Sequence, residues 1–229
     1  MAAGSHPQLH LVVGLTLRET TGALLAIIRS AAENGVDWVQ VRDHQAAARD
    51  LYELARAVVG ICRPLGVRVA VNDRLDVALA AGVDAVQLSA RSLPIAVARE
   101  LDHPGSGRPA LQIGASVHDL DAARRAVAAG ADWLTFGHVY PTASHPGEPP
   151  RGLGALTEVA VAVGAPVIAI GGIDRSNVDD VPRTGAAGVA VISAILGAPD
   201  PGAATAELRR ALDRSSGRMA GVLPESRPT

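Results

Sequence analysis

Short apolar runs alternate with helix-like segments along the whole chain, and this alternation restricts the possible folds more than any other feature. The runs are mostly aliphatic and do not alternate with polar residues, which is typical of strands buried on both faces of a parallel sheet. The eight runs cover residues 9–14, 38–41, 67–71, 85–88, 111–115, 133–136, 167–170 and 188–192. Helical patterns follow them over residues 21–34, 46–65, 74–81, 94–101, 120–129, 156–163, 175–183 and 203–212. This order favours a parallel sheet with helical crossovers.

A short motif precedes every second apolar run. Its copies, at residues 32–39, 79–86 and 127–134 with a weaker one at 183–189, share a glycine that we expect to end a helix in the left-handed conformation. A spacing of about two strand–helix units is what a barrel of four similar quarters produces. We therefore predict an α/β fold, a single (β/α)₈ TIM barrel over residues 1–214, with a flexible tail over 215–229. An open doubly wound sheet is less favoured, because no Gly-x-Gly-x-x-Gly turn follows the first run.

Composition excludes several function classes. The 229 residues carry a formal net charge of −2 and only 2% aromatic residues, so neither a basic nucleic-acid surface nor a stacking platform for single strands is expected. No uninterrupted apolar stretch reaches the roughly 18 residues of a membrane span, and the N-terminus lacks the pattern of a signal peptide. The single cysteine, Cys62, cannot form an internal disulfide. We expect a cytoplasmic protein without a nucleic-acid or membrane partner.

Polar residues gather where the predicted strands end. In barrels of this kind the catalytic residues come from the carboxyl ends of the strands. The residues at these ends are Gln40, Arg42 and His44 after the second run, Asn72, Asp73 and Arg74 after the third, Ser116 and His118 after the fifth, and Gly137 and His138 after the sixth. A proline-rich loop over residues 141–154 follows the sixth run. A long loop at this end of a barrel predicts a lid over the active site.

Two late strand ends predict a phosphate site. Gly171 and Gly172 follow the seventh run, where glycine lets backbone N–H groups approach an anion closely. Ile192 and Ser193 end the eighth run, and a helix starting there would aim its positive end at the same point. A tight turn with a helix-capping serine is the structural alternative. Adjacent late strands are where such barrels often hold phosphate, so we favour the phosphate site.

The charged residues at these strand ends allow more than one interpretation. Arg42 is suited to bind a phosphate or carboxylate, or it forms an ion pair at the rim with Asp43 or Asp73. Asn72 and Asp73 hold a metal ion or cap the following helix. The end of the next run, residues 87–92, contains no carboxylate that would complete a Mg²⁺–diphosphate site.

Three of the histidines near the predicted mouth can be interpreted individually. His138 can exchange a proton near pH 7 or simply bond the backbone at a turn, and its place beside the lid favours the first. His118 is interpreted as capping a helix and His145 as facing solvent. No cluster of histidines, cysteines and carboxylates has zinc spacing.

Together these motifs resemble the thiamin phosphate synthase family over residues 9–212. The resemblance is carried by residues 39–42, 71–74, 114–118, 141–142, 152–153, 168–173 and 189–195. The family resemblance implies one of two activities. A synthase joins a pyrimidine diphosphate to a thiazole phosphate carboxylate with Mg²⁺. A TenI-type thiazole tautomerase isomerises the thiazole phosphate carboxylate to its aromatic form without a metal.

Four departures from the synthase pattern decide our prediction between the synthase and the tautomerase. Ser92 stands where the synthase has an aspartate ligand of Mg²⁺, and His138 stands where it has proline. His44 and His145 each replace a lysine, the second of which helps the synthase to bind diphosphate. These departures favour an isomerase, a cofactor-free tautomerase that aromatises a 2-carboxy-4-methylthiazole ethyl phosphate tautomer, with His138 as its acid–base group.

The predicted site also includes binding residues. The substrate would contact Gln40, Arg42, Asn72, Ser116, Thr142 and Ser144, and its phosphate would contact Gly171, Gly172, Ile192 and Ser193. Two alternatives stay open. One is a thiamin phosphate synthase that condenses hydroxymethylpyrimidine diphosphate with thiazole phosphate and holds Mg²⁺ on Asp73. The other is a non-catalytic regulator that binds thiamin phosphate. The oligomeric state is also left open, a homo-oligomer included.

Overall fold

Eight parallel strands close into a barrel, which confirms the predicted fold. The computed structural model describes residues 6–15, 20–102 and 109–220. The strands are β1 (Gln8–Val13), β2 (Trp38–Val41), β3 (Arg68–Asn72), β4 (Ala85–Leu88), β5 (Gln112–Val117), β6 (Trp133–Gly137), β7 (Val167–Ile170) and β8 (Gly188–Val191). Each strand pairs with its neighbours in chain order, and β8 pairs with β1 to close the ring.

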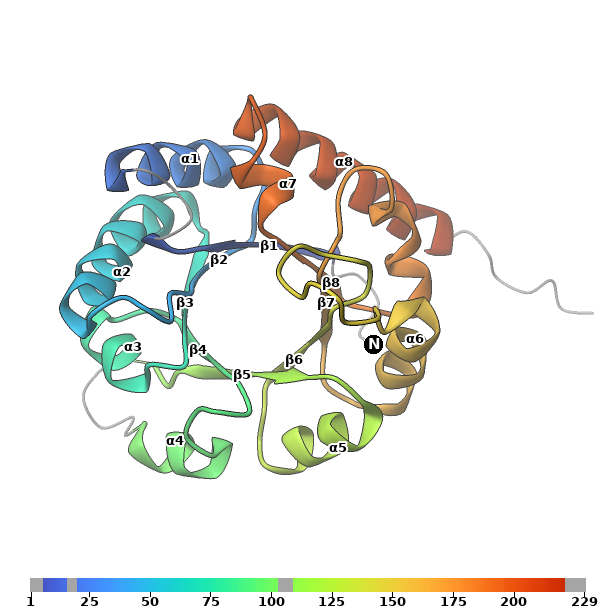
Figure 1. The fold of residues 1–229 in the computed structure, drawn as a ribbon, viewed down its shortest axis with the longest axis horizontal. Coiled ribbons are helices and arrows are strands. Elements are labelled where there is room, and N and C mark those ends of the chain that lie inside the picture. Colours follow the sequence, from blue (N-terminus) through green and yellow to red (C-terminus); the bar gives the residue numbers. More distant parts are fainter. Residues whose placement is uncertain (1–5, 16–19, 103–108, 221–229) are drawn as a thin grey trace, which may run out of the picture.

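A ring of helices surrounds the barrel (Figure 1). The α-helices are α1 (Thr21–Glu33), α2 (Ala48–Cys62), α3 (Leu75–Ala81), α4 (Ile95–Leu101), α5 (Leu120–Ala128), α6 (Gly152–Ala162), α7 (Ser193–Leu196) and α8 (Pro201–Ala220). The 3₁₀ turns include η2 (Arg63–Leu65), η4 (Val178–Asp180) and η5 (Pro182–Thr184). Within the described residues, no helix is both long enough and apolar enough to cross a membrane.

The repeated motif has two structural roles. Its glycines adopt positive φ, as Gly82 does at the end of α3 with a φ of 67°. Its aspartates bind backbone N–H groups of the preceding strand. The three contacts are Leu9 N–H to Asp37 Oδ2 at 2.7 Å, Val69 N–H to Asp84 Oδ2 at 2.8 Å and Ile113 N–H to Asp132 Oδ2 at 2.6 Å. The motif therefore turns the chain back toward the barrel and fixes successive strands to each other.

Two tryptophans pack inside the barrel near the amino-terminal ends of the strands. Trp38 and Trp133 are the first residues of β2 and β6, and their ring centroids lie 5.4 Å apart. Gly114 makes room for them, since a Cβ there would lie 2.3 Å from the Trp133 ring. The two indoles thus close the amino-terminal end of the barrel, and the space for a ligand is left at the carboxyl ends of the strands.

Three predicted boundaries are corrected. Residues 175–183 form the 3₁₀ turns η4 and η5 rather than an α-helix, because Pro182 has no N–H with which to continue one. α6 begins at Gly152, earlier than predicted, so the connection after β6 is shorter. α8 continues to Ala220, past the predicted start of the tail, and Ser215 Oγ donates to Asp179 Oδ1 at 3.1 Å. Residues 221–229 of that tail lie outside the described residues.

The buried His10 makes stability depend on pH. Its ring is 1% exposed and stacks on Trp38, and its nitrogens bond Gln8 and Gln40. Burial, with a smaller effect from the charge of Arg68, lowers the pKa of His10 from 6.5 to about 3. Below pH 6.5 His10 becomes protonated in the unfolded chain, whereas in the folded chain it stays neutral until the pH falls to about 3. The free energy of unfolding should therefore fall by up to about 1.4 kcal/mol per pH unit as the pH drops through this window.

Urea denaturation at about pH 6 and about pH 5 measures this dependence. Other groups titrate in the same range, so the readout is the difference between the wild type and His10→Gln. The variant should lose less stability over the interval. An equal loss in both proteins would show that His10 does not titrate in this way.

Candidate active site

A cavity of about 550 Å³ opens at the carboxyl ends of the strands. Its wall includes most residues that the sequence singled out, which come from β2, β3, β5 and the segments after β6, β7 and β8. These are Gln40, Arg42, His44, Asn72, Asp73, Ser116, His118, His138, Thr142, Ser144, His145, Gly171, Ile192 and Ser193. Gly172 does not line it. The fold thus gathers side chains that are far apart in the sequence around one space.

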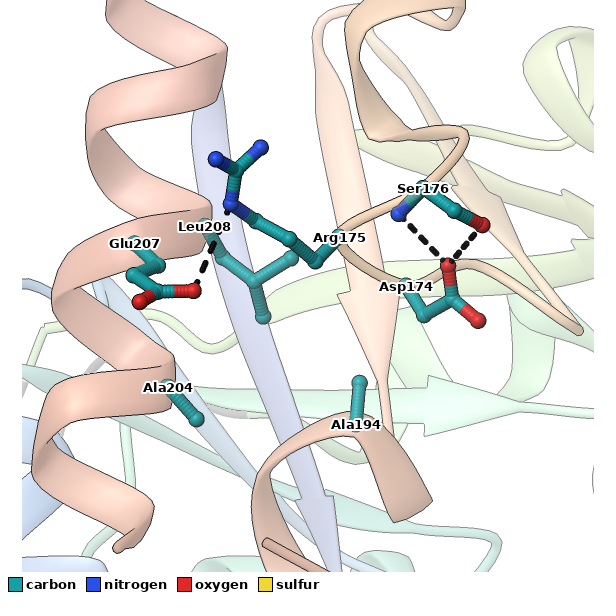
Figure 2. A pocket seen from close by; sticks show the side chains of 7 residues that line it. All are labelled: Asp174, Arg175, Ser176, Ala194, Ala204, Glu207 and Leu208. Carbon is teal, nitrogen blue, oxygen red and sulfur yellow. Dashed lines mark hydrogen bonds and ion pairs between the residues drawn. The ribbon is translucent and has the colours of Figure 1, made fainter.

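A second cavity, of about 440 Å³, lies between α8, α7 and the segment after β7 (Figure 2). Its charged groups already have partners in its own wall. Arg175 Nε lies 3.3 Å from Glu207 Oε2, and Asp174 Oδ1 accepts hydrogen bonds from the backbone and hydroxyl of Ser176. The cavity at the barrel mouth, by contrast, contains unpaired polar groups, and we take it as the candidate site.

Asp73 is held ionised at the edge of this cavity. Ser89 Oγ donates to Asp73 Oδ1 at 2.6 Å, and Ser92 Oγ donates to the same oxygen. His44 Nδ1 lies 3.5 Å from Asp73 Oδ2. Burial acts to raise the pKa of Asp73, but the two hydroxyl donors and His44 outweigh it and hold the pKa below its usual value. Residues 87–92 therefore supply hydroxyl groups to Asp73, although they contain no carboxylate.

Asn72 and Asp73 do not cap the following helix, which was one of their two predicted roles. The N-cap of α3 is Arg74, and no side chain caps that helix end. Asn72 Oδ1 is buried and has no hydrogen-bond partner. An unpartnered buried oxygen is costly and calls for a ligand. Two neighbouring oxygen donors, one amide and one carboxylate, are therefore available to a cation or a donor group of a ligand.

Two buried glutamines shape the floor of the cavity. Gln40 Nε2 lies 2.9 Å from His10 Nδ1, while His10 Nε2 lies 3.0 Å from Gln8 Oε1. Since the Gln8 carbonyl only accepts, His10 carries its proton on Nε2 and accepts from the Gln40 amide. Gln87 Nε2 donates to Ser116 Oγ at 3.0 Å.

Sequence reasoning missed Gln87, and it missed Thr135, whose Oγ1 donates to Gln87 Oε1 at 3.3 Å. A glutamine inside an otherwise apolar strand, as in the sequence AVQL of β4, is the signal that could have found the first. Thr135 carries a similar signal, as a polar residue in the middle of the buried strand β6.

The predicted phosphate residues divide into two groups. Gly171, Ile192 and Ser193 line the cavity. Gly172, with a φ of 66°, instead packs under the lid, because a Cβ there would lie 2.4 Å from the Pro141 carbonyl oxygen. α7 is a single turn, so the helix dipole contributes little and backbone N–H groups are left as the main donors to an anion.

Arg42 is an exposed cation at the same mouth. Among the described residues it forms no ion pair, so the alternative pairing with Asp43 or Asp73 is not found. Its guanidinium is therefore free to contact an anionic ligand.

The histidines occupy unexpected positions. His138, which follows Gly137 through a cis peptide bond, is 4% exposed, and its ring stacks on His145 with centroids 4.7 Å apart. His118 does not cap α5, because Asp119 does so. Instead, His118 Nδ1 lies 2.6 Å from the Gly137 carbonyl oxygen. His145 is exposed, as predicted, and in addition its ring contacts His138 and its Nδ1 lies 3.6 Å from Glu148 Oε1.

Known proteins resemble this chain over most of its length. Residues 9–195 match the family model described as thiamine monophosphate synthase. A putative thiamine-phosphate synthase of Geobacter sulfurreducens is 48% identical over 180 residues, which is 78% of this chain and 82% of that protein. A thiamine-phosphate synthase of Methanoculleus marisnigri is 46% identical over 184 residues, covering 80% and 85% of the two chains. The structure of thiamine phosphate pyrophosphorylase from Pyrococcus furiosus superposes with a TM-score of 0.80 at 37% identity, over 91% of this chain and 96% of that one.

These relatives overturn the prediction of a tautomerase, and with it that of an isomerase. The names of the similar proteins agree with the synthase alternative. The prediction failed because it judged the substituted side chains without knowing what they contact in the fold. It treated Ser92 as a lost metal ligand, whereas the structure shows Ser92 donating to Asp73 and helping to keep that carboxylate charged.

Proposed function

Because this chain belongs to the thiamine monophosphate synthase family, we propose that it is a transferase that condenses hydroxymethylpyrimidine diphosphate with thiazole phosphate and releases diphosphate. The observation that carries the proposal is that two neighbouring residues at the mouth of the barrel offer oxygen donors. Asp73 is ionised, and Asn72 Oδ1 is buried without a hydrogen-bond partner. When diphosphate leaves, a cation stabilises its negative charge, and oxygen ligands at the mouth of the barrel would hold that cation.

The donor set fits Mg²⁺. This ion is usually held by one or two carboxylates together with substrate phosphates and water. Asp73 would supply the carboxylate and Asn72 the amide oxygen, and both line the cavity. When bound, the ion would neutralise charge on the diphosphate leaving group.

The remaining residues of the cavity would bind and orient the two substrates. Arg42 would contact the diphosphate, since its guanidinium is unpaired among the described residues. Gly171, Ile192 and Ser193 would receive the thiazole phosphate on the opposite side of the mouth. Gln40, Ser116, Thr142 and Ser144 would place the rings. A closed lid would exclude water, which would otherwise hydrolyse the activated pyrimidine.

An assay with both substrates tests the proposal. The purified protein is incubated with the pyrimidine diphosphate and the thiazole phosphate, with Mg²⁺ or with EDTA, and the products are quantified by mass spectrometry. We expect equal amounts of thiamin phosphate and diphosphate with Mg²⁺, and neither with EDTA. Tight binding of thiamin phosphate without any turnover would contradict the proposal and favour the non-catalytic regulator.

A further inference from the structure

The lid and the end of β6 bring together three metal-ligating side chains that the proposed transfer reaction does not use. They are His138, His145 and Glu148, and each offers a ligand atom within 4.8 Å of the others. Among the described residues, no other group of three or more histidine, cysteine or acidic side chains has its ligand atoms close enough together to hold an ion. Their spacing in the sequence matches no zinc motif, so the cluster is visible only in the fold.

One pair of ligand atoms already lies close to the spacing that a single ion requires, and all three lie within 4.8 Å of one another, although the stacked histidine rings would have to tilt apart. His145 Nδ1 lies 3.6 Å from Glu148 Oε1. Two ligands at about 2.0–2.1 Å from a tetrahedral Zn²⁺ are themselves separated by about 3.4 Å. His138 Nε2 already faces the same segment, at 3.3 Å from the Glu148 carbonyl oxygen. Of the three residues, only His138 is buried, so the two lid side chains are free to adjust.

The backbone of the lid brings His145 and Glu148 to the same side of a turn. His145 N–H donates to the Thr142 carbonyl at 3.2 Å, and Glu148 N–H donates to the His145 carbonyl at 3.4 Å. Gly147 between them has a φ of 80°, a conformation that glycine adopts without cost. The two ligands are therefore placed by local turns, while the third is fixed by the barrel.

We propose that His138, His145 and Glu148 form a binding site for a transition-metal ion such as Zn²⁺, with one coordination position left for water. Two imidazoles and one carboxylate are the ligand set of many open zinc sites. Imidazole nitrogens select Zn²⁺, Co²⁺ or Ni²⁺ over Mg²⁺, which prefers oxygen. The site is thus chemically distinct from the oxygen donors at Asp73, and it does not depend on the proposed transferase activity.

Binding at this site would anchor the lid. His138 and His145 both line the cavity, but His138 directly follows β6, whereas His145 and Glu148 lie farther along the loop between β6 and α6. An ion shared by the three residues would hold that loop against the end of β6. Without an ion, the same residues are joined by a stacked imidazole pair, a half-exposed His145–Glu148 contact and the contact of His138 Nε2 with the Glu148 carbonyl oxygen.

Titration of the full-length, EDTA-treated protein with Zn²⁺ and Co²⁺ tests the site. We expect one ion per chain by calorimetry, a visible Co²⁺ spectrum of tetrahedral type, and slower hydrogen exchange of the lid amides after metal binding. Loss of a residue that only supports a metal ligand weakens metal binding by about 10–100-fold. His145→Ala and Glu148→Gln each remove a ligand, so each should weaken Zn²⁺ binding by more than that. Both residues are on the surface, so the variants should fold normally, which circular dichroism checks.

His6→Ala is the matched control. His6 is exposed, contacts Asp37 at the opposite end of the barrel and belongs to no cluster among the described residues. It should bind Zn²⁺ like the wild type. Equal Zn²⁺ affinity of the wild type, His145→Ala and Glu148→Gln would overturn the proposal, because the ion would then bind elsewhere. A Co²⁺ spectrum of octahedral type would also overturn it.

Discussion

Replacing Asp73 with asparagine should lower kcat for thiamin phosphate formation by about 10²–10³-fold, the range expected when one preorganised electrostatic group is lost from an active site. The variant keeps the size of the side chain and an oxygen that accepts from Ser89 and Ser92. It removes only the negative charge, which those two hydroxyls help to maintain. The lower kcat should therefore reflect weaker binding of the cation and of the diphosphate group.

The backbone at Asp73 makes asparagine the appropriate substitution. Asp73 has a φ of 62°, in the left-handed region that asparagine and aspartate tolerate better than other residues with a side chain. Asp73→Asn should therefore fold like the wild type. In addition to the lower kcat, we expect a higher Mg²⁺ concentration at half-maximal activity.

Steady-state kinetics over a range of Mg²⁺ concentrations measure both effects. The control is Asp76→Asn, which neutralises a carboxylate three positions away that pairs with Arg74 outside the cavity. That control should keep its activity. If Asp73→Asn retained activity close to that of the wild type, Asp73 could not be the cation ligand.

Gly188→Ala should cause the largest loss of stability, about 3 kcal/mol or more in the free energy of unfolding. Gly188 pairs with Gln8 at the seam where β8 meets β1 and the barrel closes. A Cβ at this position would lie 2.2 Å from the Gln8 carbonyl oxygen and 2.7 Å from its nitrogen. Because these are backbone atoms, no side chain can rotate away and the seam itself must open.

Thermal and urea denaturation measure this loss. At about 2–4 °C per kcal/mol for a chain of this size, Tm should fall by about 6–12 °C. Gly60→Ala is the control, since Gly60 lies on the exposed side of α2 and no atom would contact the added methyl group within 4 Å. It should stabilise the protein by about 1 kcal/mol. A Gly188→Ala protein as stable as the wild type would show that the seam is looser than the structure indicates.

The architecture was predictable because its signals are local. A buried parallel strand shows itself as a short apolar run, and the glycine of the repeated motif marks a helix end, whatever the rest of the chain does. β2, β4 and β7 have the bounds that the sequence predicted. The segment 175–183 was mispredicted because its apolar spacing outweighed Pro182, whose effect on the backbone prevails in the structure.

The candidate site was predictable only as a set of residues. Parallel strands place their carboxyl ends together, so a polar residue at any such end could be assigned to the mouth before its neighbours were known. The partners of those residues were not predictable. Asp73 meets Ser89 and Ser92 across 16 and 19 positions, and Gln40 meets His10 across 30. These contacts depend on the strand register and on side-chain rotamers.

The sequence alone therefore determined the barrel, the end at which the cavity opens and the family, because periodicity, turn residues and motifs are properties of short segments. Only the tertiary structure decided the chemical state of the site. It showed Ser92, inferred to be a lost metal ligand, donating to a charged Asp73, and it placed ligand atoms of His138, His145 and Glu148 within 4.8 Å of one another. The physical reason is that a pKa and a coordination geometry depend on distances of a few ångströms, and barrel closure sets those distances between residues that the sequence keeps apart.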